Sequence, residues 1–265
     1  MNIENVKLED IAEISKMTPE NWWNIGPIFE LYLKLNFCHP VKLTEDNEII
    51  GIGTAILYKN SSWIAHLIVK NSYQNKGFGK KILDYLCEYC LNNGKKTILL
   101  FATEMGYPLY KKFGFEIQTE YMQYERVNDM EYIINNNVTN IQKIDYGKIL
   151  ELDKIVIGED RSVLLNNYFD NGFVYKQNNE ISGFYLPELG NGLIIADNNE
   201  AGLELLKLRL KNNNQAVIPV ENMFGNNYYR ENKYKEIMKI KRMIYGNKIE
   251  CINEKIYNRI GGNFG

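Results

Sequence analysis

The second half of the chain repeats, in the same order, the pattern of apolar and polar segments found in the first half. The clearest match joins NEIIG at 47–51 to NEISG at 179–183. Self-similarity of this kind is typical of a tandem duplication, although any β-α-β unit shares part of the outline. The further matches pair apolar runs 63–69 with 192–197, helical patterns 80–93 with 200–212, apolar runs 96–102 with 215–220, and tyrosine segments 110–115 with 229–234.

The length of the chain fits two domains as well. Its 265 residues correspond to two units of about 130 residues, each large enough to bury its own core. A polar stretch at 127–140, which contains the run NNN, separates the two repeats. The predicted domains are therefore 1–128 and 129–265.

Hydrophobic periodicity predicts an α/β (α+β) fold, in which each half has a mixed, largely antiparallel sheet flanked by helices. Apolar segments separated by polar turns predict an antiparallel meander over 41–69. The segment 19–35 has mostly helical spacing, and a second helix is expected at 80–93, followed by Gly94 where a helix often ends. The remaining predictions for the first half are a buried strand at 96–102, a short helix at 105–114 and one or two strands at 115–127.

The octapeptide QNKGFGKK (74–81) joins a predicted strand to a predicted helix. The first N–H groups of a helix have no acceptor within the helix, and the helix dipole makes this end positive. Glycine lets the backbone approach an anion without a Cβ in the way. Because Lys76, Lys80 and Lys81 add positive charge, the segment predicts a binding site for phosphate groups.

Two common phosphate-binding motifs do not fit this segment. A P-loop has Ser or Thr after its lysine and widely spaced glycines, whereas Lys81 follows Lys80, and Gly77 and Gly79 lie close together. A dinucleotide fingerprint needs a third glycine three positions after Gly79, where the chain has Ile82. That fingerprint also favours a parallel sheet, whereas the preceding strands indicate hairpins.

Two motifs of the first half resemble the GNAT superfamily of acyl-CoA-dependent N-acetyltransferases. Gln74-x-x-Gly77-x-Gly79 is similar to the loop that holds the pyrophosphate of coenzyme A in that family. The later segment A-T-x-x-G-x-x-L-Y-x-x-x-G-F (102–115) is similar to a second family signature, in which a tyrosine on a short helix precedes Gly-Phe. Both motifs stand in the expected order, and the resemblance covers about residues 1–127.

The resemblance implies that acetyl-CoA is the co-substrate and that an amine attacks its thioester directly, without a covalent enzyme intermediate. Backbone groups of the strand 63–69, which splays from its neighbour, would hold the pantetheine arm and polarise the thioester carbonyl. Tyr110 is the implied acid that protonates the departing thiolate, and the alternative is that it only packs beneath Phe115. The residues implied in binding acetyl-CoA are Leu67, Ile68, Val69, Gln74, Asn75, Lys76, Gly77, Phe78, Gly79, Lys80 and Thr103.

His66, one of two histidines in the chain, is a candidate base for the amine. It could act through a water molecule, or it could be a buried histidine with its hydrogen bonds satisfied. Strict alternation along the strand places it with Ile64 and Ile68, opposite Leu67 and Val69.

Two further pairs of residues are candidates for contact with the acceptor. Trp22 and Trp23 fall between the first helices, where members of the family shape the acceptor pocket, but they could equally pack against the helix. Asp160 and Arg161 could close a pocket between the two halves, or they could form only local ion pairs.

The second half resembles the non-catalytic GNAT-like domain of a group of tandem bacterial acetyltransferases. The residues that carry this resemblance are Asp160-Arg161, Arg242-Met243 and the closing GGNFG. At the position of the phosphate loop it has NNEAG (198–202) in place of Gln-x-x-Gly-x-Gly. Glu200 would stand where phosphates bind and would repel them. We therefore expect one acetyl-CoA site, in the first domain.

The composition narrows the partners but does not identify the acceptor. The net charge is −2 at pH 7 without a basic stripe, which argues against nucleic acid. With no secretory signal and no long apolar run, we expect a cytoplasmic protein that does not engage a membrane. No metal is expected, and Cys87 and Cys90 fall on the core-facing side of a helix. We expect the acceptor to be a small-molecule or peptide amine. Two alternatives to an acetyltransferase stay open: a sensor or scaffold that binds acyl-CoA without turnover, and a transferase that uses a longer acyl-CoA.

Overall fold

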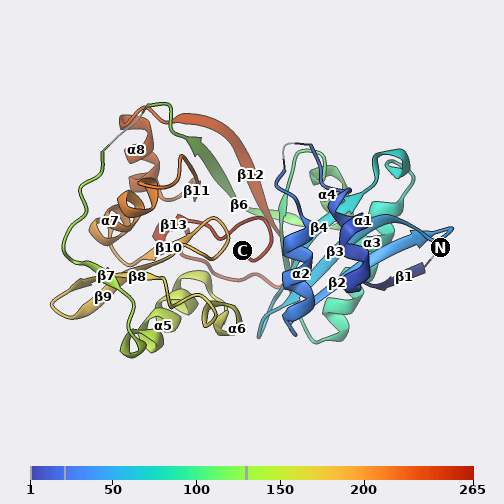
Figure 1. Ribbon diagram of the computed structural model, residues 1–265, viewed down its shortest axis with the longest axis horizontal. Coiled ribbons are helices and arrows are strands. Elements are labelled where there is room, and N and C mark those ends of the chain that lie inside the picture. Colours follow the sequence, from blue (N-terminus) through green and yellow to red (C-terminus); the bar gives the residue numbers. More distant parts are fainter. Residues whose placement is uncertain (1, 21, 129–130) are drawn as a thin grey trace.

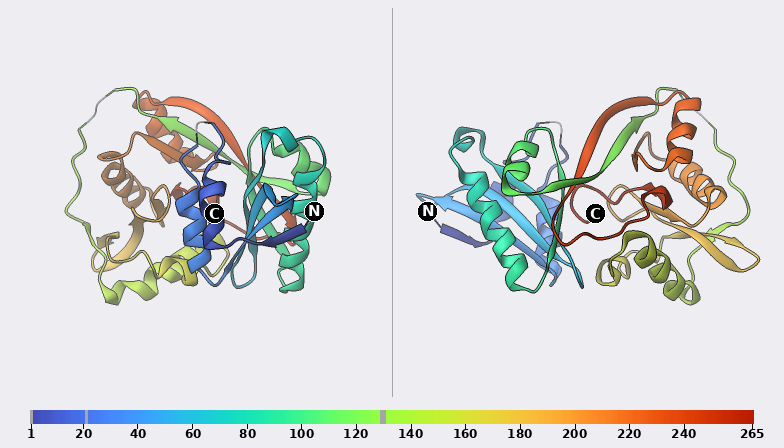
Figure 2. Two further views of the ribbon diagram at one scale, coloured as in Figure 1. Left: turned by 45° about the vertical axis from the view of Figure 1, so that its right-hand side comes forward. Right: turned by 180° about the vertical axis from the view of Figure 1, so that it is seen from behind.

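A computed structural model describes residues 2–20, 22–128 and 131–265. Figure 1 shows two halves side by side, each with its own helices. Two long strands, β6 (Glu116–Glu125) and β12 (Lys235–Gly246), run between the halves. Figure 2 shows the same bridge from two other directions, with the C-terminus between the halves.

The first half forms a mixed, largely antiparallel sheet flanked by helices, which confirms the predicted fold class. The bulk of its secondary structure follows the hydrophobic periodicity of the sequence. Its other elements are β1 (Asn2–Asn5), η1 (Leu8–Asp10), α1 (Ile11–Ser15), α2 (Gly26–Lys34), β2 (Cys38–Glu45), β3 (Glu48–Leu57), β4 (Ser62–Val69), η2 (Asn71–Tyr73), α3 (Phe78–Asn92), β5 (Thr97–Ala102) and α4 (Tyr107–Phe113).

The helix expected over 19–35 is shorter than predicted, because α2 begins only at Gly26. Pro27 lies in its first turn, where a missing N–H is tolerated, but a preceding helical turn would clash with the proline ring. The Asn24 side chain accepts a hydrogen bond from the amide of Gly26 at 2.9 Å and marks the start of the helix. Trp22 and Trp23 therefore lie in the loop between α1 and α2.

One eight-stranded sheet contains strands from both halves, in the order β1-β2-β3-β4-β5-β12-β6-β11. β12 comes from the second half, yet it lies between β5 and β6 and is antiparallel to both. In turn, β6 from the first half pairs with β11 (Gln215–Pro219) of the second half. The segment 115–127 supplies one strand rather than two, so each half completes its sheet with the long strand of the other.

The other strands of the second half form a five-stranded sheet with the order β13-β10-β9-β8-β7. Its β8–β9 hairpin turns at Asn178 and Asn179, and the matching β2–β3 hairpin turns at Asp46 and Asn47; all four residues have positive φ, as a tight hairpin turn requires. The predicted repeat is thus visible in backbone geometry. The remaining elements are β7 (Val138–Asn140), η3 (Lys143–Asp145), α5 (Tyr146–Ile157), α6 (Ser162–Leu165), β8 (Phe173–Gln177), β9 (Glu180–Leu186), β10 (Leu193–Ala196), α7 (Asn199–Leu210), α8 (Met223–Glu231), η4 (Asn253–Lys255) and β13 (Ile256–Asn258).

The two halves share a continuous apolar core on one face of the large sheet. There, Phe29 and Tyr32 of α2 belong to the same buried cluster as Leu164, Phe169 and Phe264 of the second half. A separate core lies under α3 and α4, and a third lies under α7 and α8. None of the helices in the described ranges combines the length and the apolar character needed to cross a lipid bilayer.

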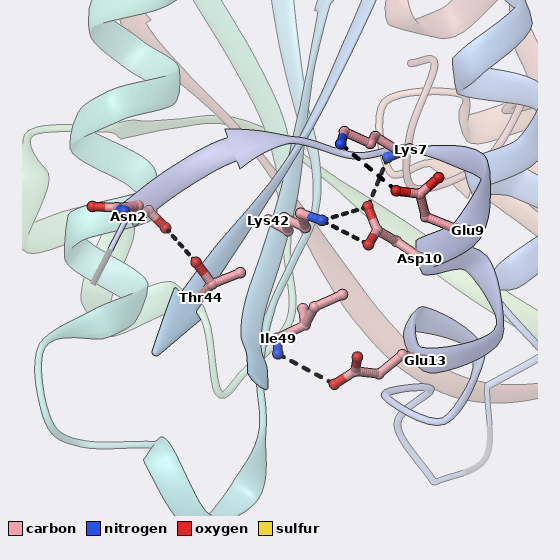
Figure 3. A network of polar contacts seen from close by, with 8 residues as sticks. All are labelled: Asn2, Lys7, Glu9, Asp10, Glu13, Lys42, Thr44 and Ile49. Atoms are coloured by element: carbon pink, nitrogen blue, oxygen red, sulfur yellow. Dashed lines mark hydrogen bonds and ion pairs between the residues drawn. The ribbon is translucent and has the colours of Figure 1, made fainter. Parts of the chain in front are cut away.

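A buried ion pair fastens the start of the chain to the large sheet (Figure 3). Lys42 on β2 donates to both carboxylate oxygens of Asp10, at 2.6 and 2.7 Å. Asp10 also accepts a hydrogen bond from the amide of Lys7 at 2.7 Å. Only 10% of each side chain in the ion pair is exposed, so loss of one partner would strand a buried charge.

Replacing Asp10 with alanine should lower the free energy of unfolding by about 1.5–3 kcal/mol, because Lys42 loses its charged acceptor inside the protein. The matched control is Glu9→Ala, since Glu9 pairs with Lys7 at 3.6 Å in a largely exposed position, and its effect should stay below about 0.5 kcal/mol. Urea denaturation of both variants measures the difference. Equal losses in the two variants would contradict a structural role for the buried pair.

Candidate active site

Strands β4 and β5 run parallel but pair only where they begin. Ser62 lies opposite Ile98 and Trp63 opposite Leu99. Beyond Trp63 the two strands diverge, and no other strand of the described chain lies between them. This is the splay that the resemblance implies, and the backbone of residues 67–69 borders the opening.

A β-bulge interrupts β4 at the start of this opening. Ile52 of β3 pairs with Ile68, whereas Thr54 pairs with Ala65, so the bulge takes up one extra residue of β4. His66 lies within it and has φ +50°.

The bulge changes which side chains share a face of β4. Ile64 packs in the core under α3, together with Leu67 and Val69, whereas Ile68 packs in the core under α2. The expectation from strict alternation is therefore wrong for Ile64. His66 lies opposite Leu67 and Val69, since its ring lies beside those of Phe29 and Tyr32 on α2.

The loop that follows β4 leaves a run of backbone N–H groups without partners. Asn75 and Gly77 have φ of +61° and +87°, which turns the chain sharply into α3. The amide of Lys81 donates to the carbonyl of Gly77 at 3.1 Å, whereas the amides of 75–80 donate to no group in the described parts of the chain. α3 has 15 residues, so its dipole adds to the positive potential here. The loop has the backbone geometry of an anion site.

Gln74 ties the loop to the end of β4. Its Nε2 atom donates to the carbonyl of Val69 and to Oδ1 of Asn71, both at 3.0 Å. The glutamine of the motif thus holds the loop in place through its side chain.

The lysines of the motif stay near the surface. Lys76 Nζ lies 5.3 Å from the ring centroid of Tyr73, which in turn packs 6.0 Å from the ring of Phe78. Lys80 pairs with Asp84 at 2.7 Å, one turn along α3, and both side chains are largely exposed. An exposed pair of this kind is weak, so Lys80 remains available to a phosphate.

Gly79 brings three elements close together. A Cβ at this position would lie 3.4 Å from Leu109 of α4, 3.7 Å from Leu67 and 3.8 Å from Val69. The start of α3 therefore contacts both the end of β4 and the helix that carries Tyr110. A larger side chain at Gly79 would push against these three elements.

Tyr110 lies on α4 in the core beneath α3, with 8% of its surface exposed. Its ring packs edge-to-face on Phe115, with the centroids 5.9 Å apart. Burial raises the pKa of Tyr110 to about 12, so the phenol is protonated at neutral pH. Its hydroxyl makes no hydrogen bond to any described residue. This geometry is therefore compatible with both roles considered for Tyr110, which are packing beneath Phe115 and protonating the departing thiolate.

Thr103 stabilises the start of α4. Its Oγ1 atom accepts a hydrogen bond from the amide of Gly106 at 3.1 Å, and its carbonyl accepts one from the amide of Tyr107 at 2.9 Å. The threonine of the motif thus orders the helix that carries Tyr110. Direct contact between Thr103 and a cofactor stays a prediction.

On the face of β4 opposite Leu67 and Val69, the His66 side chain lies among aromatic rings. Its Nδ1 atom is 2.8 Å from the hydroxyl of Tyr32, and its ring centroid is 5.8 Å from Phe29 and 6.2 Å from Trp22. Burial lowers the pKa of His66 to about 4, so the ring is neutral at neutral pH. Trp23 is 95% exposed. Of the two tryptophans in the α1–α2 loop, only Trp22 thus joins this group.

Asp160 and Arg161 are engaged within the second half. Arg161 is buried and donates to the carboxylate of Asp153 at 2.5 and 3.1 Å. Asp160 accepts a hydrogen bond from the amide of Ser162 at 3.2 Å. Arg161 thus forms a local ion pair, and it also lines a small cavity between the halves together with Trp63 and Arg242. The structure shows no ion pair of Asp160 with another described residue.

Sequence patterns did not identify the last residues of the chain as part of this region. The ring of Phe264 lies 5.7 Å from Tyr32, and its carbonyl accepts a hydrogen bond from the hydroxyl of Tyr58 at 2.9 Å. The segment GGNFG has no periodicity that would assign it a partner, so no pattern in the sequence signals this contact.

In the second half, the slot that corresponds to the β4–β5 opening is filled by the chain itself. β13 is antiparallel to β10, the equivalent of β4. On its other side it meets β11, the equivalent of β5, where Asn258 Oδ1 accepts from the amide of Val217 at 3.0 Å and the amide of Arg259 donates to the Val217 carbonyl at 3.1 Å. A strand therefore lies where the first half is open.

Tyr257 covers the start of α7, the position equivalent to the phosphate loop. A Cβ at Gly202 would overlap the Tyr257 ring, and the Tyr257 hydroxyl donates to Asn199 at 2.7 Å. Glu200 accepts a hydrogen bond from Tyr175 at 2.6 Å. A carboxylate and a packed aromatic ring thus share the site, and the sequence indicated only the carboxylate.

Two family models match the chain, and both are described as an acetyltransferase (GNAT) domain. One covers residues 39–117 and the other residues 149–258. Among curated proteins, the [Ribosomal protein bS18]-alanine N-acetyltransferase of Haemophilus influenzae is 29% identical over 119 residues, which are 43% of this chain and 77% of the relative.

Solved structures extend the likeness to the whole chain. A protein of Pyrococcus horikoshii described as "a putative acetyltransferase" superposes with a TM-score of 0.81 and 25% identity, over 100% of this chain and 95% of that one. A GCN5-related N-acetyltransferase of Anabaena variabilis shares the fold, with a TM-score of 0.60 and 10% identity over 92% of this chain and 72% of that one. With a family match in each half and a structural neighbour that spans both, the chain belongs to the GNAT acetyltransferase family and carries two GNAT domains in tandem.

Proposed function

We propose that this chain is an N-acetyltransferase that transfers the acetyl group of acetyl-CoA to a primary amine by direct attack. The observation that carries the proposal is one continuous feature of the first half. The opening between β4 and β5 leads straight into a loop whose amides, at 75–80, have no partner in the described chain. Such a feature suits a long ligand with an anionic end.

The residues present fit coenzyme A. The amides of 75–80 would hold the pyrophosphate, with Lys76 and Lys80 at the rim and open space beside Gly77 for close approach. The backbone of 67–69 would hold the pantetheine arm. Acetyl-CoA supplies an activated thioester, and the described residues contain no group of His, Cys, Asp and Glu able to hold a metal ion.

In the proposed reaction, the amine nitrogen forms a bond to the acetyl carbon while the carbon–sulfur bond breaks. Backbone N–H groups along β4 would stabilise the negative charge that develops on the carbonyl oxygen. Tyr110 would give its phenolic proton to the departing sulfur, for which its protonated state at neutral pH is suited. The proton lost by the amine passes to water, and Tyr110 regains a proton from water before the next turnover.

We propose a single acetyl-CoA site, in a catalytic domain that spans 1–128. The domain that spans 129–265 would lack one, because β13 fills its slot and Tyr257 and Glu200 occupy the start of α7. Its contribution would be the strand β12, which completes the catalytic sheet.

The acceptor is proposed to be a small-molecule or peptide amine in the cytoplasm. The name of the Haemophilus relative concerns the alanine of a ribosomal protein, so peptides with a free N-terminus belong in a test panel beside polyamines, aminoglycosides and other small amines. Nucleic acid and membranes are not expected partners.

A thiol-release assay over this amine panel tests the proposal. At least one amine should release coenzyme A from acetyl-CoA at a rate that depends on both enzyme and amine. If coenzyme A binds but no amine accelerates thiol release, the sensor or scaffold alternative is favoured. If a longer acyl-CoA competes and turns over faster than acetyl-CoA, the donor assignment is wrong.

A further inference from the structure

The C-terminal tail, residues 259–265, reaches the aromatic group around His66 in the first half. Its Phe264 packs on Tyr32 of α2 and is fixed by the hydrogen bond from Tyr58. Burial raises the pKa of the Tyr32 phenol, and Asn263, the neighbour of Phe264 in the chain, counters this effect in part. The second half thus supplies Phe264 to the aromatic group around His66, whose other members belong to the first half.

Tyr32 links this tail to His66. It is fully buried, and burial raises the pKa of its hydroxyl well above the usual value, so it stays protonated. Its oxygen is 2.8 Å from Nδ1 of His66. Either the Tyr32 hydroxyl donates to Nδ1 or an Nδ1–H donates to the Tyr32 oxygen, and this direction decides what His66 can do.

A buried hydroxyl needs an acceptor for its proton. Within the described chain, the one hydrogen bond of the Tyr32 hydroxyl is that with His66 Nδ1. The Tyr32 proton therefore points at Nδ1. Because a neutral imidazole has one N–H, an accepting Nδ1 places the ring proton on Nε2.

We propose that the C-terminal tail, acting through Tyr32, fixes His66 as the Nε2–H tautomer, which donates a hydrogen bond to the acceptor and does not remove its proton. Tyr32 and Asn263 are then positioning residues. The acceptor would be an amine with an oxygen near its nitrogen, such as the first carbonyl of a peptide. That role rests on the proposed function, whereas the position of the ring proton does not.

The ring proton can be located in the full-length protein without any substrate. Labelling the chain with ¹⁵N-histidine gives a two-bond ¹H–¹⁵N correlation spectrum with only two rings, His39 and His66. A His39→Gln variant assigns them. At neutral pH, His66 should show Nδ1 as a bare nitrogen and Nε2 as a protonated one. A protonated Nδ1, or an averaged pair, would overturn the proposal.

Two variants test whether the tail and Tyr32 impose this state. In Tyr32→Phe the His66 nitrogen signals should move toward the average of the two tautomers, and in Asn263→Leu they should move in the same direction by less. His39 stacks on Tyr89 with centroids 3.8 Å apart, away from the tail, so its signals are the internal control. If His66 signals stay fixed in both variants, the positioning role is wrong.

Activity distinguishes a donor from a base at His66. Glutamine retains an N–H donor near the place of Nε2 but cannot act as a base, whereas leucine retains neither. We expect kcat/KM for an accepted amine to be at least tenfold higher in His66→Gln than in His66→Leu. Equal losses in the two variants would refute the donor role. Failure of every amine in the wild-type protein would instead refute the proposed function and leave the tautomer result standing.

Discussion

Replacing Tyr110 with phenylalanine should lower kcat by about 100-fold, the lower range for loss of a general acid, and leave the affinity for coenzyme A nearly unchanged. Phenylalanine fills the same volume and keeps the edge-to-face contact with Phe115, so α4 should not move. Only the proton for the departing sulfur is lost. Steady-state turnover, together with a coenzyme A dissociation constant, measures the two effects separately.

The repeat provides a matched control for this substitution. Tyr229 lies on α8 at the position that corresponds to Tyr110, is fully buried and has a hydroxyl without a partner among the described residues. Tyr229→Phe should therefore leave turnover unchanged. If Tyr110→Phe stays within about twofold of wild type, the acid role is wrong.

The ion pair between Arg161 and Asp153 should have the largest effect on stability. Only 1% and 2% of the two side chains are exposed. Removing one partner leaves an uncompensated charge in the core, so Arg161→Met should lower the free energy of unfolding by about 3–5 kcal/mol. Chemical denaturation of the variant and the wild type gives this difference directly.

The corresponding double variant distinguishes a buried charge from a loss of packing. In Asp153→Leu/Arg161→Met both charges are replaced by apolar side chains, and stability should return to within about 1–2 kcal/mol of wild type. A double variant that is less stable than either single variant would show that the pair is needed for its shape or contacts. A loss below about 1 kcal/mol in Arg161→Met would contradict the assignment of a buried, local pair.

Local signals in the sequence were sufficient for the loop and the helices around it. The αL glycine Gly77, the end of α3 near Gly94 and the short helix before Gly114 follow from turn and capping rules. The late start of α2 was missed, although Pro27 in its first turn is a local signal for it. These features depend on neighbouring residues and are therefore encoded nearby.

Features that depend on distant partners could not be predicted in the same way. Alternation identifies a strand but not its neighbour, so nothing in β12 indicates that it lies between β5 and β6. The bulge at His66 breaks the alternation at a non-glycine residue with positive φ, which no pattern marks. The contact of Phe264 with Tyr32 joins the two ends of the chain and has no local signal.

The second half shows the same difference between features with local signals and features that depend on distant residues. Glu200 indicated from the sequence that phosphate is disfavoured at the start of α7, and the structure adds that Tyr257 packs there on Gly202. From the sequence alone, Gly202 had no assigned role. In the structure it leaves room for an aromatic ring of the same chain.

Calorimetric titration with coenzyme A tests most directly whether the chain has a single cofactor site at the 74–81 loop. Substitutions of the glycines at the two ends of α3 provide a test variant and its matched control. Gly77 and Gly94 have φ of +87° and +75°, and a Cβ added at either position would have no atom within 4 Å. Aspartate should therefore strain the backbone about equally at both. Only Gly77 belongs to the phosphate loop. A carboxylate there should repel the pyrophosphate, whereas Gly94→Asp should bind as wild type.

We expect one coenzyme A per chain in the wild type and in Gly94→Asp, and at least tenfold weaker binding in Gly77→Asp, equivalent to about 1.4 kcal/mol. Two coenzyme A molecules per chain, or undiminished binding in Gly77→Asp, would contradict a single site at this loop.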